Sequence, residues 1–415
     1  MRFINSKQNF DGEFTFHGDK SITHRAIMLN GVARGVAILK NPSLGEDCLA
    51  TCRAMEKLGA KIEKTADGLK ITGALTLNDN QELDCGNSAT TLRLLTGLLA
   101  GFGVNAKLYG DKSLSNRPME RVAEPLRVLG AKIQTTNAKS PVFVEKSRII
   151  GGKIALKVPS AQVKSAILLA GLGGDKETVV TEEVPTRDHT ERMLEVMGAK
   201  IIRSNGKISI SKSELTATDM EVPADISSAS YFMALGALKG RALCKNLCVN
   251  PTRTGILKAF DKFGVQYSVL NKRIVCGEEV ADILVKKSIL SPVRITKTEV
   301  PSMIDELPLI AMLCSFAKGE SVISGAQELK YKECDRILAT AELINSLGGV
   351  CIPTTDGFIV EGFGGLDGGA VESYGDHRIA MTGAIALLAS KNGGELYGDK
   401  HCAISFPDFF EKLGV

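Results

Sequence analysis

The chain has 415 residues, of which 44% are hydrophobic, so it can bury more than one core and we expect at least two domains. Its formal net charge of +4 at pH 7 comes from 51 lysines and arginines against 47 aspartates and glutamates. This small excess, with no tryptophan and 5% aromatic residues, disfavours nucleic-acid binding and fits small anionic ligands better.

The same composition predicts a soluble cytoplasmic protein. Residues 1–9 contain no apolar signal segment, and the longest apolar run, residues 379–389, is too short to cross a bilayer. The ten cysteines are scattered, and neither pair spaced by four residues (Cys48 with Cys52, Cys244 with Cys248) has further ligands at zinc-like spacing. We therefore expect reduced thiols and no metal site.

The first predicted helix begins within residues 18–25. Ser21 or Thr23 can cap it, and Lys20 and Arg25 place two cations around its first turn, which favours an anion site. A P-loop is excluded because Gly18 and Lys20 are not adjacent. Taken alone, the stretch also fits a capped helix with solvated charges.

Two kinds of helix then alternate along the chain. The first kind is amphipathic and ends at a glycine, with spacings of 71, 68, 66, 84 and 66 residues between Gly59, Gly130, Gly198, Gly264, Gly348 and Gly414. The second kind is apolar around most of its circumference, as buried helices are, near residues 24–33, 90–100, 162–172, 227–238, 307–317 and 378–389. Together they predict six β-α-β-α-β-β repeats, three to a domain.

The repeats also predict the domain boundaries. The last repeat has no strand material after Gly414, whereas the N-terminal residues alternate in a strand-like pattern around Phe14 and Phe16. We expect residues 18–226 to form one domain and residues 1–17 with 227–415 to form the other. The crossings near residues 17–18 and 223–226 contain the Gly, Pro and Asp typical of hinges.

Polar residues collect just before or at the start of the apolar helices, in residues 18–25, 84–91, 159–164, 223–228, 301–308 and 375–378. Helix caps account for the Ser, Asn and Asp in these stretches. They do not account for Lys20, Arg25, Lys164 or Arg378, because the helix dipole disfavours cations at an N-terminus. We expect bound anions to balance these charges. Residues 110–119, 185–190 and 329–336 add further polar loops, each of which could be structural when taken singly.

Taken together, these motifs resemble the 5-enolpyruvylshikimate-3-phosphate (EPSP) synthase family over essentially the whole chain. The matching blocks are GDKSITHRA, GNSATTLRLL, SLSNRPM, PSAQVKSA, TRDHTERM, PADISSA, KYKECDR and GDHRIAM. The resemblance implies a two-domain inside-out α/β barrel of six repeats with the active site in the cleft between the domains. It also implies transfer of the enolpyruvyl group of phosphoenolpyruvate to the 5-hydroxyl of shikimate-3-phosphate by addition and elimination, without a cofactor or metal.

The resemblance assigns roles to individual residues. Asp305 would deprotonate the 5-hydroxyl, Glu333 would handle the proton at the methylene carbon, and Lys20 would touch both substrates. Shikimate-3-phosphate would bind to Lys20, Ser21, Arg25, Ser160, Ala161, Gln162, Thr186, Arg187, Asp305 and Lys332. Phosphoenolpyruvate would bind to Lys20, Asn87, Ala89, Arg117, Gln162, Arg336 and Arg378. We expect His24, His189 and His377 to be structural.

Some positions depart from the family pattern. Many members have Gly where this chain has Ala89, and in this respect the chain resembles the glyphosate-tolerant branch. Ala161 and Glu328 replace Ser and Asn of other members.

The closest rival is UDP-N-acetylglucosamine enolpyruvyl transferase, whose reactive cysteine is missing from residues 110–117 here. A non-catalytic anion-binding protein is the other alternative. We expect a monomer that binds neither membrane nor nucleic acid.

Overall fold

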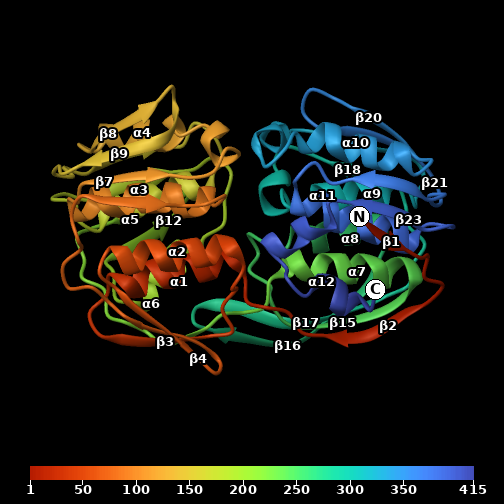
Figure 1. The fold of residues 1–415 in the computed structure, drawn as a ribbon, viewed down its shortest axis with the longest axis horizontal. Helices are drawn as coiled ribbons and strands as arrows, with labels where there is room; N and C mark the ends of the chain where they lie inside the picture. Colours follow the sequence, from red (N-terminus) through yellow and green to blue (C-terminus); the bar gives the residue numbers. More distant parts are fainter. The chain divides into compact units, whose positions relative to one another are not determined.

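The computed structural model describes residues 1–415, which divide into two compact units (Figure 1). The N-terminal unit comprises Gly18–Val222 and Val275–Glu278. The C-terminal unit comprises Met1–His17, Pro223–Ile274 and Glu279–Val415. Residues 223–226 therefore group with the C-terminal unit, although we expected them in the first domain, and nothing in the sequence pattern pointed to residues 275–278 as part of the N-terminal unit.

The N-terminal unit contains three four-stranded sheets, ordered β14-β3-β5-β4, β6-β7-β9-β8 and β10-β11-β13-β12. Its strands are β3 (Val36–Lys40), β4 (Lys61–Thr65), β5 (Gly68–Thr72), β6 (Gln81–Asp84), β7 (Ala106–Tyr109), β8 (Lys132–Thr136), β9 (Lys139–Glu145), β10 (Gly152–Ala155), β11 (Thr178–Thr181), β12 (Ile201–Ser204), β13 (Lys207–Ile210) and β14 (Met220–Glu221). Its helices are α1 (Lys20–Gly31), α2 (Glu46–Lys57), α3 (Ala89–Phe102), α4 (Glu120–Val128), α5 (Ala161–Gly171) and α6 (His189–Val196), with a 3₁₀ turn η1 (Leu114–Asn116).

The second and third sheets are each built by one repeat, whereas the first takes its edge strand β14 from residues 220–221, after the third repeat. In the second repeat, β6 runs through the buried helix α3 into β7, which lies parallel to β6. Helix α4 then leads to the hairpin β8–β9, in which β9 is antiparallel to β7 and β8 is antiparallel to β9. The parallel pair needs a helical crossover, whereas the antiparallel pair needs only a tight turn. The predicted β-α-β-α-β-β unit is therefore confirmed, in sheets that are separate from one another.

Helices α1, α3 and α5 form the core of the N-terminal unit. Each is buried around most of its circumference, as predicted, and the buried residues include polar ones such as Arg25 on α1 and Lys164 on α5. Helix α3 approaches α5 closely at Gly97 and Gly101, where an added Cβ would meet the backbone of Ala166 and Ala170. The two glycines therefore set how closely these two helices can pack.

The C-terminal unit repeats the plan with sheets β16-β17-β15-β2, β18-β19-β21-β20 and β1-β23-β22. Its strands are β1 (Arg2–Ile4), β2 (Phe10–Phe14), β15 (Gly240–Cys248), β16 (Gln266–Val275), β17 (Glu278–Lys286), β18 (Arg294–Ile295), β19 (Lys318–Ile323), β20 (Val350–Pro353), β21 (Phe358–Phe363), β22 (Gly369–Glu372) and β23 (Gly394–Tyr397). Its helices are α7 (Ile226–Lys239), α8 (Gly255–Phe263), α9 (Leu307–Cys314), α10 (Arg336–Ser346), α11 (His377–Ala389) and α12 (Phe409–Leu413), with 3₁₀ turns η2 (Val300–Ser302), η3 (Gln327–Tyr331) and η4 (Asp399–Ile404).

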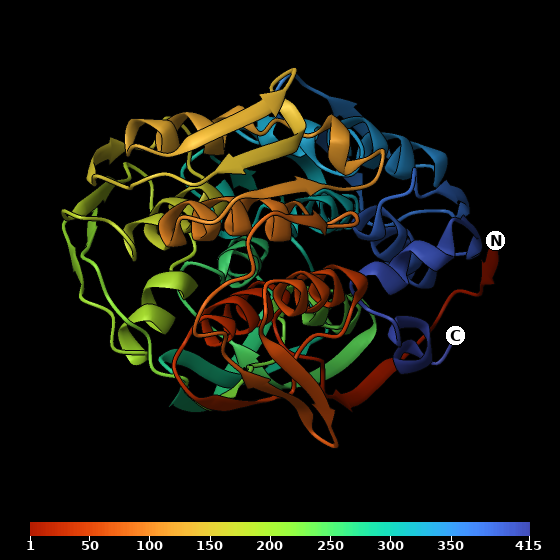
Figure 2. The same cartoon turned by 60° about the vertical axis from the view of Figure 1, so that its left-hand side comes forward.

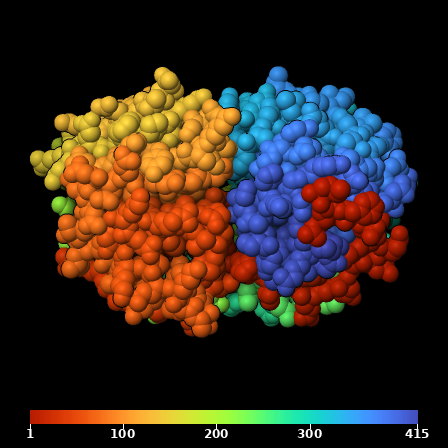
Figure 3. All heavy atoms as spheres, viewed as in Figure 1, coloured from red at the N-terminus to blue at the C-terminus, as the bar shows by residue number.

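The N-terminal strands complete two sheets of the C-terminal unit. Strand β1 pairs antiparallel with β23, and β2 pairs parallel with β15. The two chain ends meet there, since the Arg2 guanidinium donates to the carbonyl of Val415 at 2.9 Å (Figure 2). In the space-filling view the red N-terminal residues lie on the blue C-terminal ones (Figure 3). The core of this unit gathers around α7, α9 and α11.

Helix ends follow the sequence pattern closely. The glycines that end the amphipathic helices, from Gly59 to Gly414, all have positive φ, between 66° and 106°, as a helix-terminating glycine should. Helix α9 ends at Cys314, three residues before the predicted end at residue 317. No helix of the structure is both long enough and apolar enough to span a membrane.

We predict that Gly97→Ala destabilises the N-terminal unit. An added Cβ would lie 2.1 Å from the carbonyl oxygen of Ala166, so α3 and α5 would have to separate. Overpacking of this kind costs roughly 1–3 kcal/mol, and each kcal/mol lowers the melting temperature of a unit of this size by about 2–4 °C. Thermal unfolding measures the shift. Gly365→Ala, where an added Cβ would meet nothing within 4 Å, is the control; equal melting temperatures for both variants would contradict the prediction.

Candidate functional site

Arg25 is a buried cation in the first turns of α1. Its guanidinium donates to the Thr190 hydroxyl at 2.7 Å, the Ser165 hydroxyl at 2.7 Å and the Ser21 carbonyl at 2.9 Å. Burial lowers the pKa of Arg25 to about 10, and the nearby guanidinium of Arg187 acts in the same direction. Arg25 therefore stays charged at neutral pH and is held by partners on three helices.

Lys20 is the first residue of α1, and its ammonium forms an ion pair with Asp47 of α2 at 2.9 Å. Asp19 caps the same helix by accepting from the Ile22 amide at 2.9 Å. The helix terminus thus has a side-chain cap, and the lysine charge has a carboxylate partner within the unit. About a fifth of the Lys20 side chain remains exposed, so its ammonium can also reach a ligand.

The N-termini of α3 and α5 are joined by direct hydrogen bonds. Gln162 donates to the Thr90 hydroxyl at 2.9 Å and accepts from Arg93 at 2.7 Å. Ser160 caps α5, and Ala161 is the first residue of that helix. The structure therefore brings Ser160, Ala161 and Gln162 to the helix end beside the start of α3, and Arg93 fixes the Gln162 amide.

Asn87, Ala89 and Arg117 gather at the start of α3. The Asn87 carbonyl accepts from Arg117 at 3.0 Å, and its amide donates to Asp111 at 2.8 Å. Ala89 is the first residue of α3 and is only 5% exposed. A methyl group at this position is thus packed against neighbouring atoms and leaves little spare room.

Thr186 and Arg187 lie in the loop that leads into α6. Arg187 donates to the Ser21 hydroxyl at 3.4 Å, so this loop contacts the first turn of α1. Lys164 has a different environment from the one we expected. Its ammonium is fully buried against Glu182 at 3.1 Å and Glu191 at 2.7 Å, so carboxylates of the protein balance its charge, and the expectation of a bound anion there is wrong.

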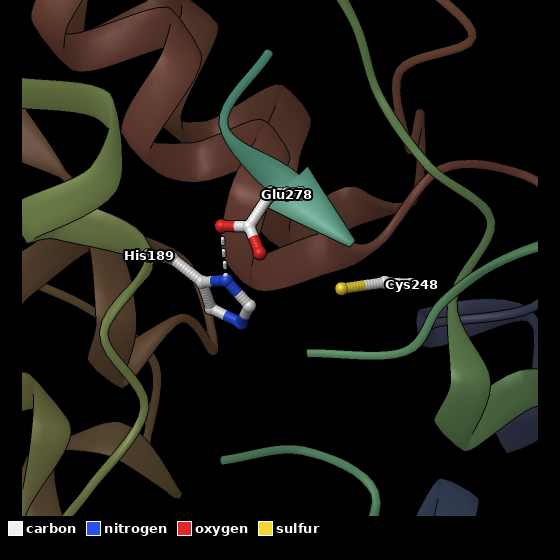
Figure 4. Close-up of side chains that lie close together, drawn as sticks. All are labelled: His189, Cys248 and Glu278. Atoms are coloured by element: carbon white, nitrogen blue, oxygen red, sulfur yellow. Dashed lines mark hydrogen bonds and ion pairs between the residues drawn. The ribbon is translucent and has the colours of Figure 1, made fainter. Parts of the chain in front are cut away.

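The histidines near the motifs of this unit make contacts within the protein. The His24 ring is buried and lies 2.7 Å from the Thr51 hydroxyl, and burial lowers the pKa of His24 to about 3. His189, at the start of α6, lies 2.8 Å from Glu278 through Nδ1 (Figure 4). The same figure labels Cys248, a residue of the C-terminal unit. Glu278 belongs to Val275–Glu278 and attaches that segment to α6.

The C-terminal unit has its own polar cluster around Asp305. This carboxylate lies in the turn before α9, 3.6 Å from the Lys332 ammonium and 3.7 Å from the Arg336 guanidinium. The Asp305 side chain is 18% exposed and that of Lys332 27%, so both reach the surface of the unit. A hydroxyl placed against Asp305 would therefore meet a base and two cations together.

Arg336 is the buried centre of this cluster. It donates to Asp376 at 2.7 Å and 3.3 Å and to Glu333 at 2.7 Å. Burial opposes its charge, but Asp376, Glu333 and Asp305 outweigh this and raise the pKa of Arg336 above its ordinary value. Asp376 also caps α11 by accepting from the Arg378 amide at 2.7 Å.

Arg378 follows this cap and is 5% exposed. It hydrogen-bonds to the hydroxyl of Tyr231 on α7. Burial raises the pKa of Tyr231 to about 12, although the charge of Arg378 and this hydrogen bond act to lower it. Tyr231 and nearby carboxylates, Asp305 among them, raise the pKa of Arg378 although burial opposes this. Five predicted residues, Asp305, Lys332, Glu333, Arg336 and Arg378, thus share one network.

The sequence interpretation missed the residues that hold these groups: Asp47, Arg93, Glu182, Glu191, Tyr231 and Asp376. Asp376 was predicted only as part of a helix cap. Asp47 occupies the first turn of an amphipathic helix, where an acidic residue needs no further explanation. The spacing of residues along the sequence did not indicate these pairings. Lys20 and Asp47, for example, are 27 residues apart.

Comparisons with known proteins show which family the chain belongs to. The family model described as EPSP synthase (3-phosphoshikimate 1-carboxyvinyltransferase) matches residues 4–413. The relative from Roseiflexus castenholzii is 43% identical over 408 residues and the one from Methylococcus capsulatus 44% over 410. These matches cover 95% and 96% of this chain and 95% and 93% of the relatives, and both relatives are named 3-phosphoshikimate 1-carboxyvinyltransferase.

Solved structures give the same result. EPSP synthase from Acinetobacter baumannii matches with a TM-score of 0.88 and 40% identity, covering 99% of this chain and 97% of that one. The enolpyruvyl transferase NikO from Streptomyces tendae matches with a TM-score of 0.79 at 18% identity, covering 99% and 96%, which supports the fold alone. On the matches over nearly its whole length, the chain belongs to the EPSP synthase family.

Proposed function

We propose that this chain transfers the enolpyruvyl group of phosphoenolpyruvate to the 5-hydroxyl of shikimate-3-phosphate and releases phosphate. Such an enzyme is a transferase of the shikimate pathway and acts in aromatic amino acid biosynthesis. The observation that carries the proposal is the match of residues 4–413 to the family, together with relatives more than 40% identical. Membership of this family favours shikimate-3-phosphate over a nucleotide sugar as the acceptor.

The cluster of the N-terminal unit supplies binding groups for anions. Arg25 and Arg187 lie near Ser21, and a phosphate ester of shikimate would neutralise two neighbouring guanidiniums. Ser160, Ala161, Gln162 and Thr186 would complete the contacts with shikimate-3-phosphate. Asn87, Ala89 and Arg117 would contact phosphoenolpyruvate, and Lys20 would contact both substrates. Each of these cations is anchored by protein partners, which fixes its position before a substrate arrives.

The cluster of the C-terminal unit supplies the proton chemistry. Asp305 would accept the proton of the 5-hydroxyl as its oxygen attacks the enol carbon, while Lys332 and Arg336 favour the negative charge that develops on that oxygen. Glu333 would protonate the methylene carbon of phosphoenolpyruvate in the addition step. When phosphate is eliminated from the tetrahedral intermediate, the resulting methyl group would lose one of its three protons back to the Glu333 carboxylate. Arg336 and Arg378 would hold the carboxylate and phosphate of phosphoenolpyruvate.

We further propose a cytoplasmic monomer that acts on these two small molecules and binds neither membrane nor nucleic acid. The formal charge of +4 on 415 residues gives little attraction for a nucleic acid. None of the ten cysteines forms a disulfide and eight of them are buried, which suits a reducing compartment. Analytical ultracentrifugation at micromolar concentration tests the oligomeric state.

We predict that Asp305→Asn lowers kcat by roughly 10²–10⁴-fold, because the amide keeps the shape of the side chain but cannot accept the proton. Phosphate release from phosphoenolpyruvate with shikimate-3-phosphate measures the change. The control is Asp67→Asn, an exposed aspartate in the turn between β4 and β5. Wild-type turnover with UDP-N-acetylglucosamine, or full activity of the Asp305 variant, would overturn the assignment.

We also propose that the chain belongs to the glyphosate-tolerant branch, with Ala89 as the determinant. Glyphosate is longer than phosphoenolpyruvate, so a buried methyl group at the start of α3 would crowd the inhibitor more than the substrate. We predict that Ala89→Gly lowers the glyphosate inhibition constant by about tenfold or more, which matches an overpacking energy of 1–3 kcal/mol.

Steady-state inhibition by glyphosate against phosphoenolpyruvate measures this effect. The KM for phosphoenolpyruvate should change much less than the inhibition constant. Thermal unfolding of the Ala89→Gly variant checks that α3 remains stable, because Gly in place of Ala costs up to about 1 kcal/mol in a helix. Equal inhibition of the wild type and the variant would refute the role of Ala89.

A further inference from the structure

A buried ion cluster lies next to the loop that carries Thr186 and Arg187. It consists of Lys164 on α5, Glu191 on α6 and Glu182, which follows β11. The side chain of Lys164 is 0% exposed, that of Glu191 1% and that of Glu182 9%. Burying three charges is costly unless each is paired in good geometry, so the cluster requires a compensating role or strong internal bonding.

Lys164 is the donor at the centre of the cluster. Its ammonium lies 3.1 Å from Glu182 Oε1, 2.7 Å from Glu191 Oε1 and 3.2 Å from the backbone carbonyl of Thr186. These three acceptors match the three N–H groups of an ammonium. The lysine therefore binds the loop directly through a carbonyl and indirectly through Glu182.

The second carboxylate oxygen of Glu182 binds Thr186, the loop residue whose carbonyl also contacts Lys164. Its Oε2 accepts from the Thr186 backbone amide at 3.1 Å and from the Thr186 hydroxyl at 2.8 Å. Both polar backbone groups of Thr186 are thus fixed, the N–H by Glu182 and the C=O by Lys164. The next residue, Arg187, reaches the Ser21 hydroxyl on α1.

We propose that Glu182, held in place by Lys164, is a positioning residue for shikimate-3-phosphate, because it fixes the loop that presents Thr186 and Arg187. The inference rests on the proposed function and deepens it. Glu182 itself touches no substrate in this scheme. It fixes the positions of Thr186 and the Arg187 guanidinium before the phosphate binds. Binding of the substrate then does not have to order the loop, which would weaken the affinity.

An uncharged amide of the same size cannot replace Glu182. With its oxygen toward Lys164, the amide NH₂ would face the Thr186 backbone N–H and leave that donor without an acceptor. With its oxygen toward Thr186, the NH₂ would face the ammonium. Glu182→Gln therefore disrupts the connection with almost no change in volume. Glu183, which is exposed, provides the matched control as Glu183→Gln.

The experiment measures steady-state kinetics of the full chain in both substrates, alongside thermal unfolding. We expect Glu182→Gln to raise the KM for shikimate-3-phosphate about tenfold, the effect of weakening charge-assisted hydrogen bonds. The value of kcat and the KM for phosphoenolpyruvate should stay within about twofold of wild type, since the loop contacts bind the ground state and the transition state alike. Glu183→Gln should match the wild type.

Other outcomes would overturn the proposal. An unchanged KM for shikimate-3-phosphate would remove the positioning role. A fall in kcat with no change in KM would mean only that fewer molecules are folded, and an equal rise in both KM values would mean general damage. If the wild type shows no turnover with shikimate-3-phosphate, the proposed function fails and this inference fails with it.

A second variant covers the case in which Glu182→Gln does not fold. Lys164→Met combined with Glu191→Gln removes one positive and one negative charge, so the net charge of the cluster is unchanged. The Thr186 carbonyl then loses its ammonium donor. We expect the same selective rise in the KM for shikimate-3-phosphate, and a wild-type KM in this folded double variant would contradict the proposal.

Discussion

The structure depends on one constraint: six helices are buried around most of their circumference, so most of their polar groups lie near their ends. A buried helix leaves its first backbone N–H groups without partners, and these must be capped. Asp19, Ser88, Ser160, Asp225 and Asp376 each accept from an amide of the helix that follows. The caps concentrate acceptors and dipoles at the same ends where anionic substrates would bind.

Several cations in the first turns of helices pair with carboxylates of the same unit. Lys20 pairs with Asp47, Lys164 with two glutamates, and Arg336 with Asp376 and Glu333. Such pairs hold each cation in one place, which lowers the reorganisation required when a substrate binds. The Asp376 carboxylate has two roles, because it caps α11 and also accepts a hydrogen bond from Arg336.

Features encoded within a short stretch of chain could be predicted from the sequence, and so could the N-terminal strands of the C-terminal unit, whereas long-range side-chain pairings could not. The repeat unit, the buried helices and the terminating glycines follow from local apolar periodicity and glycine placement. The pairing of Arg93 with Gln162 spans 69 residues, and the attachment of Glu278 to His189 spans 89. The anion expected at Lys164 was wrong because its two carboxylate partners come from separate segments that only the fold brings together.

The two units carry different polar side chains although they share one architecture. At the helix ends of the N-terminal unit, hydroxyls, amides and guanidiniums predominate, which suits recognition of a phosphate ester. In the C-terminal unit, Asp305 and Glu333 lie next to Lys332 and Arg336, which suits proton transfer beside a developing charge. The proposed addition and elimination would require both recognition and proton transfer, and one repeat architecture carries a different set of polar side chains in each unit.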